Sequence, residues 1–434
     1  MGFERKIWEM FLCVSVLALS ASFAQAESYT LERAVKAAQV QDPWLIGSMK
    51  RQESLEALSI ESGSLPDPSV SLGIANLPID TFDFSQEGMT QFKVGVSQMF
   101  PRGKTLSLKR EKLQNLSEMQ PHAREDRNAQ VAVTVSQLWL DAYKSEQTIQ
   151  LIEDDRALFE HLVDVAQSSY TTAAGKTRQQ DLVRAQLELT RLDDRLTRLR
   201  QQRDMALARL GEWLGNPSIS LSENTSLDNL IPLSAPELIS TPDYAEKHRQ
   251  LSESLSRHPK IKSIDSKIKA FDSGVRLAKQ SYKPQWGLNA SYGYRDQTPM
   301  GDDRSDFFSV GVSFDVPLFT GKRQDKKVQS ANAELEAVKT ERALILRQLK
   351  SGYDAAEAMY TRLTERKSLF DQRLLKEMAE QAEASLSAYT NDDGDFAEVV
   401  RARIAELNAR IEALHVDIEM QKNIAQLNYF HTGR

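Results

Sequence analysis

The sequence Phe92-Lys-Val-Gly-Val-Ser97 occurs a second time, with little change, as Phe308-Ser-Val-Gly-Val-Ser313. The offset between the two copies also superposes three pairs of prolines, Pro101 on Pro317, Pro68 on Pro284 and Pro43 on Pro259. Several landmarks that keep one spacing indicate an internal duplication. We therefore expect two repeats of one fold, residues 27–215 and 245–434, joined by a Pro- and Ser-rich linker over residues 216–244.

The first 26 residues have the features of a secretory signal. Arg5 and Lys6 precede the apolar run Phe11–Leu19, and Ala24-Gln-Ala26 fits a small-x-small cleavage site. The alternative is an N-terminal membrane anchor, but the apolar run is too short to span a bilayer. The one cysteine, Cys13, falls in this segment. We therefore expect a mature chain without disulfides, thiolate metal sites or thiol catalysis.

The composition favours long helices over an all-β fold. The 434 residues include only 19 glycines and 14 prolines, and 27% of them are charged. The net charge of −6 gives no support to a nucleic-acid partner. No stretch after the N-terminal segment approaches the roughly 18 apolar residues of a membrane helix. If the protein crosses a membrane, it must do so with strands.

Each repeat contains two stretches that alternate apolar with small or polar residues, as β-strands do. They are expected at about residues 68–77, 90–100, 284–295 and 306–317. Strands of this length and pattern fit an outer-membrane barrel. On that interpretation the residues that point to lipid are Val94, Tyr292 and Val312. Those that point to the lumen are Gly95, Asn289 and Ser313. The alternative is a half-buried sheet of a soluble protein, which shows the same alternation.

After each strand pair the periodicity becomes helical, which predicts helical hairpins at about residues 104–214 and 322–430. Pro121 is the only proline in the first arm and predicts a kink or a break there. Apolar residues on both returning arms recur in alternating steps of three and four, as in a coiled-coil seam. The seam residues are Ala185, Leu189, Leu192, Leu196, Leu199, Ala206 and Leu210, then Val400, Ile404, Leu407, Ile411, Leu414 and Ile418.

Four membrane strands cannot close a barrel, because single-chain barrels have at least about eight strands. An open sheet edge cannot face lipid, since its backbone groups would lack hydrogen bonds. The chain is therefore expected to pool its strands with copies of itself. A trimer would have twelve strands, and a dimer would have eight, with an interior already filled by side chains.

The duplicated strand pairs and helical hairpins, with the N-terminal signal, resemble the TolC family of outer-membrane efflux proteins. The resemblance covers essentially the whole chain from Tyr29 onward. The best local matches lie at the two helical tips and at the two strand-to-helix turns, in Tyr170…Gly175…Asp181–Gln186, Tyr389…Gly394…Glu398–Ala402, Ser97…Lys104 and Pro317…Lys322. The resemblance implies an α+β fold, with a trimeric twelve-stranded outer-membrane β-barrel continued by a periplasmic α-helical coiled-coil tunnel.

The resemblance also implies a function and partners. A homotrimer in outer-membrane lipid would be the passive duct of a tripartite efflux system, served by an inner-membrane pump through a periplasmic adaptor (membrane fusion protein). Three segments look most like components of heavy-metal cation efflux, Leu65–Pro68, Asn76–Pro78 and Val96–Gln98. The alternatives are a secreted periplasmic coiled-coil adaptor and a type I secretion duct of the outer membrane.

The tips carry the residues that the resemblance singles out. Tyr170, Gly175, Tyr389 and Gly394 are the implied contacts with the adaptor. In the family, acidic side chains near the second tip ring the closed aperture, and polar links between neighbouring coils hold it shut. The residues that match this machinery are Asp181, Glu398 and Arg401.

Glu398 matches one acidic position of the ring, and Asp181 matches a link residue of the first tip. Arg401 stands where TolC itself has a second acid, which makes the implied ring less negative or self-pairing. The alternative is that all three are ordinary capping and solvated helix charges.

No motif in the sequence points to catalysis or to a bound cofactor. The six histidines form no HxxxH pair and no HExxH motif, and Gly211–Gly215 has no phosphate-loop context. The acidic turn Asn391–Asp395 lacks the alternating ligands and distal glutamate of a calcium loop. We expect no enzyme, and no catalytic, cofactor or metal site.

Overall fold

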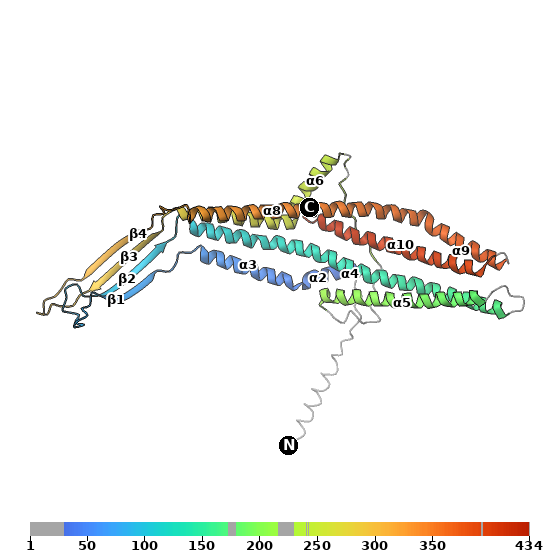
Figure 1. Cartoon of the computed structure of the whole chain (residues 1–434), viewed down its shortest axis with the longest axis horizontal. Helices are drawn as coiled ribbons and strands as arrows, with labels where there is room; N and C mark the ends of the chain where they lie inside the picture. The colour runs from blue at the N-terminus through green and yellow to red at the C-terminus, as the bar shows by residue number, and fades with distance from the viewer. Residues whose placement is uncertain are drawn as a thin grey trace, which may run out of the picture. The chain divides into compact units, whose positions relative to one another are not determined.

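The computed structural model describes residues 30–171, 179–215, 230–239, 241, 243–391 and 394–433. These residues form long helices and one four-stranded sheet (Figure 1). In chain order the elements are α2 (Leu31–Gln41), α3 (Pro43–Ser62), β1 (Ser69–Ala75), β2 (Gln91–Phe100), α4 (Thr105–Thr171), α5 (Gln179–Leu214), α6 (Tyr244–Ser256), α7 (Pro259–Lys279), the 3-10 helix η2 (Gln280–Tyr282), β3 (Trp286–Tyr294), β4 (Phe307–Phe314), α8 (Gln324–Leu369), the π-helix segment η3 (Phe370–Leu374), α9 (Leu375–Thr390) and α10 (Phe396–Phe430).

The chain forms two compact units, and each unit contains parts of both sequence repeats. Unit 1 contains the chain up to Asp42, Asn128–Leu238 and Asp354–Tyr429. Unit 2 contains Pro43–Arg127, Ile239–Tyr353 and the residues from Phe430 onward. The sheet lies in unit 2, and the tips of the two helical hairpins lie in unit 1.

The short helices begin at capping residues that the sequence shows directly. Thr30 caps α2, because its hydroxyl accepts a hydrogen bond from the backbone N–H of Arg33 at 3.3 Å. Pro43 and Pro259, which the repeat offset superposes, are the first residues of α3 and α7. Proline is favoured at this position because the N–H that it lacks would have no helical partner.

The first long arm, α4, runs through Pro121 as one helix, so the expected break at this proline is wrong, while the alternative of a kink stays a prediction. A proline removes only one i→i−4 hydrogen bond, and a helix of 67 residues has many others. The preceding residue, Gln120, is buried and accepts a hydrogen bond from Ser48 of α3 at 2.9 Å. This contact holds the helix at the weak point.

The second long arm differs from the first, because η3 interrupts it between α8 and α9. A π turn accommodates one extra residue and rotates the side chains that follow it. Here it places Phe370 in a small core with Leu363 and Val416. No proline or glycine lies at this place in the sequence, so the sequence carries no signal of it.

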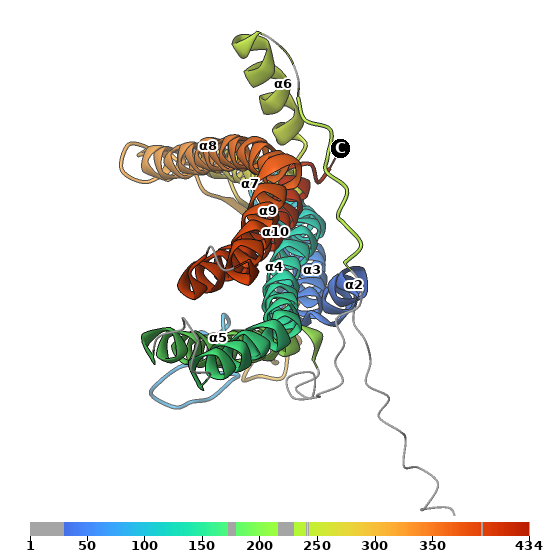
Figure 2. The ribbon, with the colours of Figure 1, turned by 90° about the vertical axis from the view of Figure 1, so that its right-hand side faces the viewer.

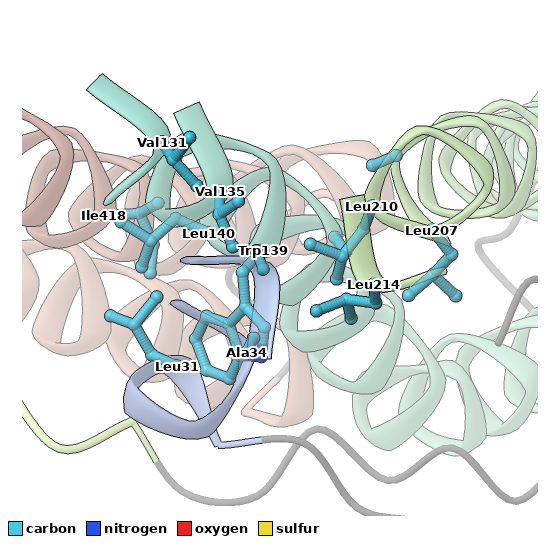
Figure 3. Packing of buried hydrophobic residues seen from close by; sticks show 13 residues of the cluster. Leu31, Ala34, Val131, Val135, Trp139, Leu140, Leu207, Leu210, Leu214 and Ile418 are labelled. Carbon is cyan, nitrogen blue, oxygen red and sulfur yellow. The ribbon is translucent and has the colours of Figure 1, made fainter. Parts of the chain in front are cut away.

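The core of unit 1 forms where α4, α5 and α10 pack on one another, and α2 joins the cluster around Trp139 (Figure 2). Trp139 is fully buried among the residues of this cluster (Figure 3). Its ring stacks on that of Tyr143, with 5.1 Å between the centroids. The predicted heptad seam is confirmed on both returning arms, since its residues are buried or partly buried in the helix cores. The most deeply buried of them are Leu196, Leu210, Leu407, Ile411 and Ile418.

The four strands form one antiparallel sheet in the order β1-β2-β3-β4 (Figure 1). Strands β2 and β3 come from different repeats, and they pair from Phe92 opposite Tyr294 to Phe100 opposite Trp286. The two hairpins therefore make a single surface. Strand β1 ends earlier than expected, because Asn76 adopts a left-handed conformation with φ of 56°. Among the described residues, no helix is both long and apolar enough to pass through a bilayer.

Candidate functional site

The sheet of unit 2 has one continuous apolar face. Residues that lie opposite one another in an antiparallel sheet share a face. One such row crosses all four strands, from Leu72 to Val94 to Tyr292 to Phe308. The residues of this face alternate with small or polar ones over most of each strand; the exceptions are Gln98 on this face and Met99 and Phe307 on the opposite one. Most of the apolar residues of this face are exposed; Leu72 is 69% and Phe308 72% exposed. The relative sides predicted for Val94, Tyr292 and Val312 agree with this register.

The opposite face carries small and polar side chains. Its rows include Ser71, Gly95, Ser291 and Ser309, which lie opposite one another. A Cβ atom on Gly95 would lie 2.7 Å from the Ser71 hydroxyl, so a larger residue there would force that hydroxyl to move. This face therefore has short side chains and hydrogen-bonding groups, which suit contact with water.

Lys93 is the only charged residue within the four strands, and it lies on the small and polar face. Gly73 of β1 and Gly293 of β3 flank it in the same row. The neighbouring strands thus offer no side chain to cover Lys93, which is exposed. Any water-filled space on this side of the sheet receives one positive charge per chain.

The two edges of the sheet are open. Strand β1 pairs only with β2, and β4 pairs only with β3. Their outer backbone N–H and C=O groups have no strand partner within the described chain. An open edge of this kind is a template for pairing with another strand.

The tip of the second hairpin, in unit 1, is tightly built. A Cβ atom on Gly394 would lie 2.7 Å from the backbone nitrogen of Tyr389, so the close approach of the two segments requires glycine. The Tyr389 ring meets the buried Phe396 ring edge-on, with 5.6 Å between centroids. Asp395 starts α10, and its carboxylate accepts a hydrogen bond from the N–H of Ala397 at 3.2 Å.

Glu398 and Arg401 lie one turn apart at the start of α10. The Arg401 guanidinium donates to the Glu398 carboxylate at 2.6 Å, and it also donates to the carbonyl of Ala397 at 3.2 Å. The side chains are 53% and 63% exposed for Glu398 and Arg401, respectively. The acid is therefore paired within its own helix, and the pair faces solvent in the single chain.

The residues expected at the first tip are only partly within the described chain. Gly175 lies outside the described residues, and Tyr170 lies in the last turn of α4. Asp181 lies in the first turn of α5 and is buried. A carboxylate at this place is stabilised by the positive end of the helix dipole. The chain therefore contributes a buried acid at one tip and an exposed ion pair at the other.

Sequence reasoning missed Arg403, which is the most buried charged residue of the second tip. Its side chain is 14% exposed, and it donates hydrogen bonds to Glu406 at 2.9 Å and to Glu383 of α9 at 2.8 Å. Burial lowers the pKa of Arg403, but the hydrogen bonds to Glu406 and Glu383 outweigh it and raise the pKa above its ordinary value. Arg403 links α9 to α10, and only the position of α9 reveals this role.

Further ion pairs tie α4 to its neighbours along unit 1. On the α5 side they are Arg156 with Asp193 at 2.8 Å, Arg200 with Glu153 at 2.8 Å and Arg203 with Glu146 at 3.0 Å. On the α10 side, Arg410 pairs with Asp155 at 2.8 Å. Each pair is at least partly exposed, so each alone contributes little to the free energy of unfolding. Within the described ranges, no group of three or more His, Cys, Asp or Glu side chains is placed to hold a metal ion.

Comparison with protein families finds one match in the sequence. Residues 250–429 match the family described as "Outer membrane efflux protein". This region contains the second part of α6, all of α7, β3 and β4, and nearly all of the second helical hairpin. No curated protein sequence matches the chain significantly.

Comparison with solved structures finds the same fold over nearly the whole chain. The outer membrane protein VceC from Vibrio cholerae is 14% identical, with a TM-score of 0.73 over 93% of this chain and 96% of that one. The CmeC outer membrane channel from Campylobacter jejuni is 15% identical, with a TM-score of 0.75 over 93% and 86%. CusC is 14% identical, with a TM-score of 0.75 over 95% and 96%. Identities this low show a shared fold, and the predicted pairing of strands with long helical hairpins is confirmed.

The burial of Arg403 leads to a prediction about stability. Replacing Arg403 with Met leaves Glu406, whose side chain is only 20% exposed, without its cation. We expect a loss of about 2 kcal/mol in the free energy of unfolding, between the values for an exposed and a buried pair, because the partly buried Glu406 is left as an uncompensated charge. Arg401→Met removes an exposed pair and should cost at most ~1 kcal/mol.

Urea denaturation of both variants, followed by circular dichroism in detergent, measures the difference. The double variant Arg403→Met/Glu406→Gln serves as a control and should recover part of the loss, since no unpaired carboxylate remains. Equal losses for Arg401→Met and Arg403→Met would contradict the role assigned to Arg403.

Proposed function

We propose that the chain is a member of the outer membrane efflux protein family and that it is the outer-membrane channel of an efflux system, a passive duct formed by three copies. The observation that carries this proposal is the sheet, which has an uncovered apolar face and two open edges. The long helical hairpins continue the duct, and the whole assembly performs no chemical step.

The apolar face needs an apolar environment. In the described chain the side chains of this face are left exposed, with Val312 at 63% and Val310 at 62%. A soluble sheet would have this face covered by other elements of its own chain. Exposed apolar patches of such extent mark an interaction surface. A bilayer supplies that surface, and the small and polar face then lines water. This arrangement argues against a soluble periplasmic adaptor.

The open edges set the number of copies. In hydrocarbon every backbone N–H and C=O group must be hydrogen-bonded, so β1 of one chain has to pair with β4 of the next. Eight strands from two chains would leave an interior filled by side chains, which is no duct. Twelve strands from three chains leave a lumen, and each chain contributes one Lys93 to it. A homotrimer therefore gives every edge strand a hydrogen-bonding partner and leaves a lumen wide enough for transport.

The helical tips are the proposed docking end of the duct. We assign Tyr170, Gly175, Tyr389 and Gly394 to contact with a periplasmic adaptor, which connects the duct to an inner-membrane pump. The tight turn at Gly394 supports a defined tip surface, because Tyr389 and Phe396 hold it in one conformation. A type I secretion duct uses the same geometry and remains the alternative. The assignment to heavy-metal cation efflux stays a prediction from the sequence segments given above.

Asp181, Glu398 and Arg401 are the proposed aperture residues. With three copies around one axis, the Glu398–Arg401 pairs would form a ring in which each carboxylate is neutralised by its own arginine. Exposed pairs are individually weak, but a ring repeats the same charge three times within a narrow opening. The aperture would then close without the repulsion that three bare carboxylates produce.

Adjacent residues of β4 give a matched test of membrane insertion. Val312 and Ser313 lie on opposite faces of one strand, so we expect Val312→Arg to expose a charge to lipid and Ser313→Arg to expose it to water. Val312→Arg should reduce the free energy of unfolding in the bilayer by ~2–4 kcal/mol if the site lies near the middle, and Ser313→Arg should change it little. The amount of trimer in the outer-membrane fraction, read on gels without boiling, is the measurement. Similar yields for both variants would contradict the proposed orientation.

The aperture assignment predicts a change in conductance. Arg401→Ala should leave three unpaired Glu398 carboxylates facing one another, which loosens closure and attracts cations. We expect higher conductance and greater cation selectivity in planar bilayers at low salt, where charge effects are least screened. Arg373→Ala, which breaks an exposed pair with Glu377 elsewhere in unit 1, is the matched control. Traces of Arg401→Ala that equal those of the control would place Glu398 and Arg401 on the outer, solvated surface.

A further inference from the structure

Three segments of unit 2 meet at the end of the sheet where the strands join the helices. They are Arg102–Lys104 after β2, Lys279–Lys283 before β3, and Asp315–Lys327 after β4; we call this region the junction. Arg102 donates to the carbonyl of Lys283 at 2.5 Å and also pairs with Asp315. The backbone N–H of Lys104 donates to the Gln280 side chain at 3.1 Å. These contacts make the junction one built surface rather than three separate loops.

The junction has a surplus of positive charge. Both of its acids are occupied internally, since Asp315 binds Arg102 and the backbone N–H of Gln285, and Asp325 accepts a hydrogen bond from Tyr282 at 2.6 Å. Its other cations are exposed and have no ion pair among the described residues. They are Lys104, Lys279, Lys283, Lys322, Arg323, Lys326 and Lys327.

Exposed apolar side chains lie directly beside these cations. Leu318 is 72% and Phe319 90% exposed, immediately before Lys322 and Arg323 in the chain. The apolar face of the sheet ends at the same place in a row of aromatic residues, Phe100, Trp286 and Phe314. The rings of Trp286 and Phe314 lie 4.9 Å apart. Aromatic residues of this kind mark the boundary between hydrocarbon and headgroups.

The opposite end of the sheet has the reverse charge. The loops between β1 and β2 and between β3 and β4 carry seven carboxylates and only two arginines, Arg295 and Arg304. The carboxylates are Asp80, Asp83, Glu87, Asp296, Asp302, Asp303 and Asp306. The two rims of the apolar face therefore differ in sign, and only the junction can attract anions.

We propose that the junction binds the phosphate headgroups of anionic phospholipids in the leaflet at that end of the sheet. This inference rests on the proposed function, because the sheet must lie in a bilayer. Clusters of several Lys and Arg residues at the edge of a membrane-embedded surface attract anionic lipid, and exposed Leu and Phe side chains insert at the acyl boundary. The lipid would fix the depth of the sheet and separate the membrane part from the helical part.

A lipid is favoured over an acidic protein by the place of the charges. They adjoin a face that must contact hydrocarbon, and Leu318 and Phe319 extend the apolar surface past the last strand residue. A protein partner would need to cover cations, aromatic rings and lipid contacts together. The same anchor explains why the cations stand at the start of α8, where positive side chains oppose the helix dipole and do nothing for helix stability.

The position of Trp286 at this rim permits a direct test. The full chain is reconstituted in phosphatidylethanolamine vesicles with Trp44 and Trp213 replaced by Phe. Trp8 falls in the expected signal segment, and Trp139 is kept because it is fully buried in unit 1, so quenching by brominated lipid reports on Trp286. Brominated phosphatidylglycerol and brominated phosphatidylethanolamine are compared at the same low mole fraction. We expect severalfold stronger quenching by the phosphatidylglycerol, which weakens at high salt because the attraction is electrostatic.

The variant Lys322→Gln/Arg323→Gln/Lys326→Gln should bring the two lipids to equal quenching. It folds as the wild type does, because it removes charges that oppose the dipole of α8. The matched control is Arg362→Gln/Arg373→Gln/Lys376→Gln, which removes the same net charge from exposed positions of unit 1 and should retain the preference.

Three outcomes would overturn the inference. Equal quenching of the wild type by both lipids would mean that the junction does not select anionic lipid. An acidic protein would then be the favoured partner of the junction, and the proposed channel function would still stand. A preference that survives in the junction variant would remove these cations from the site. No quenching by either lipid would mean that Trp286 is not at a bilayer, and the proposed function would fail with the inference.

Discussion

A β-sheet with one apolar face and two unpaired edges cannot exist alone in a membrane. Its backbone N–H and C=O groups at β1 and β4 would lie in hydrocarbon without hydrogen bonds, and each such group costs several kcal/mol. In water the same sheet would expose the row that includes Leu72, Tyr292 and Phe308. Both problems disappear when identical chains pair edge to edge within a bilayer. The number of copies, the lumen and the use of a duplicated chain all depend on this constraint.

The two repeats that the sequence predicts each supply two strands of the sheet and one helical hairpin. Pairing of β2 with β3 joins the two repeats inside a single sheet, so neither repeat has a complete surface without the other. The repeats have nevertheless diverged. The first arm is one helix of 67 residues, whereas the π segment interrupts the second arm and buries Phe370. The same divergence leaves Asp181 buried at one tip, and Glu398 paired with Arg401 in the open at the other.

Periodicity alone predicted the strands, their two faces and the heptad seam, because these depend on the spacing of apolar residues along one element. The repeat offset superposed Pro43 on Pro259, and in the structure these two prolines are the first residues of α3 and α7. The break at Pro121 was wrong, since tertiary contacts such as that of Ser48 with Gln120 hold the helix together. The π segment and Arg403 had no signal, because both depend on which neighbour lies across the helix.

The candidate site shows the same division. The presence of Arg401 where the family has an acid suggested a self-pairing arrangement, and the structure pairs Arg401 with Glu398 at 2.6 Å. The basic junction escaped the sequence analysis, because its cations come from three segments that only the fold brings together. The proposed aperture would be built from several chains, so no spacing within one chain could predict it.

The central claim is that three copies of this chain close one barrel. Light scattering after size-exclusion chromatography, with the bound detergent subtracted, measures the protein mass of the membrane-extracted particle. The account predicts three chains per particle, each with a mass of at most 49.0 kDa. A well-folded particle containing a single chain would contradict it, because the edges of β1 and β4 would then be stable without partners.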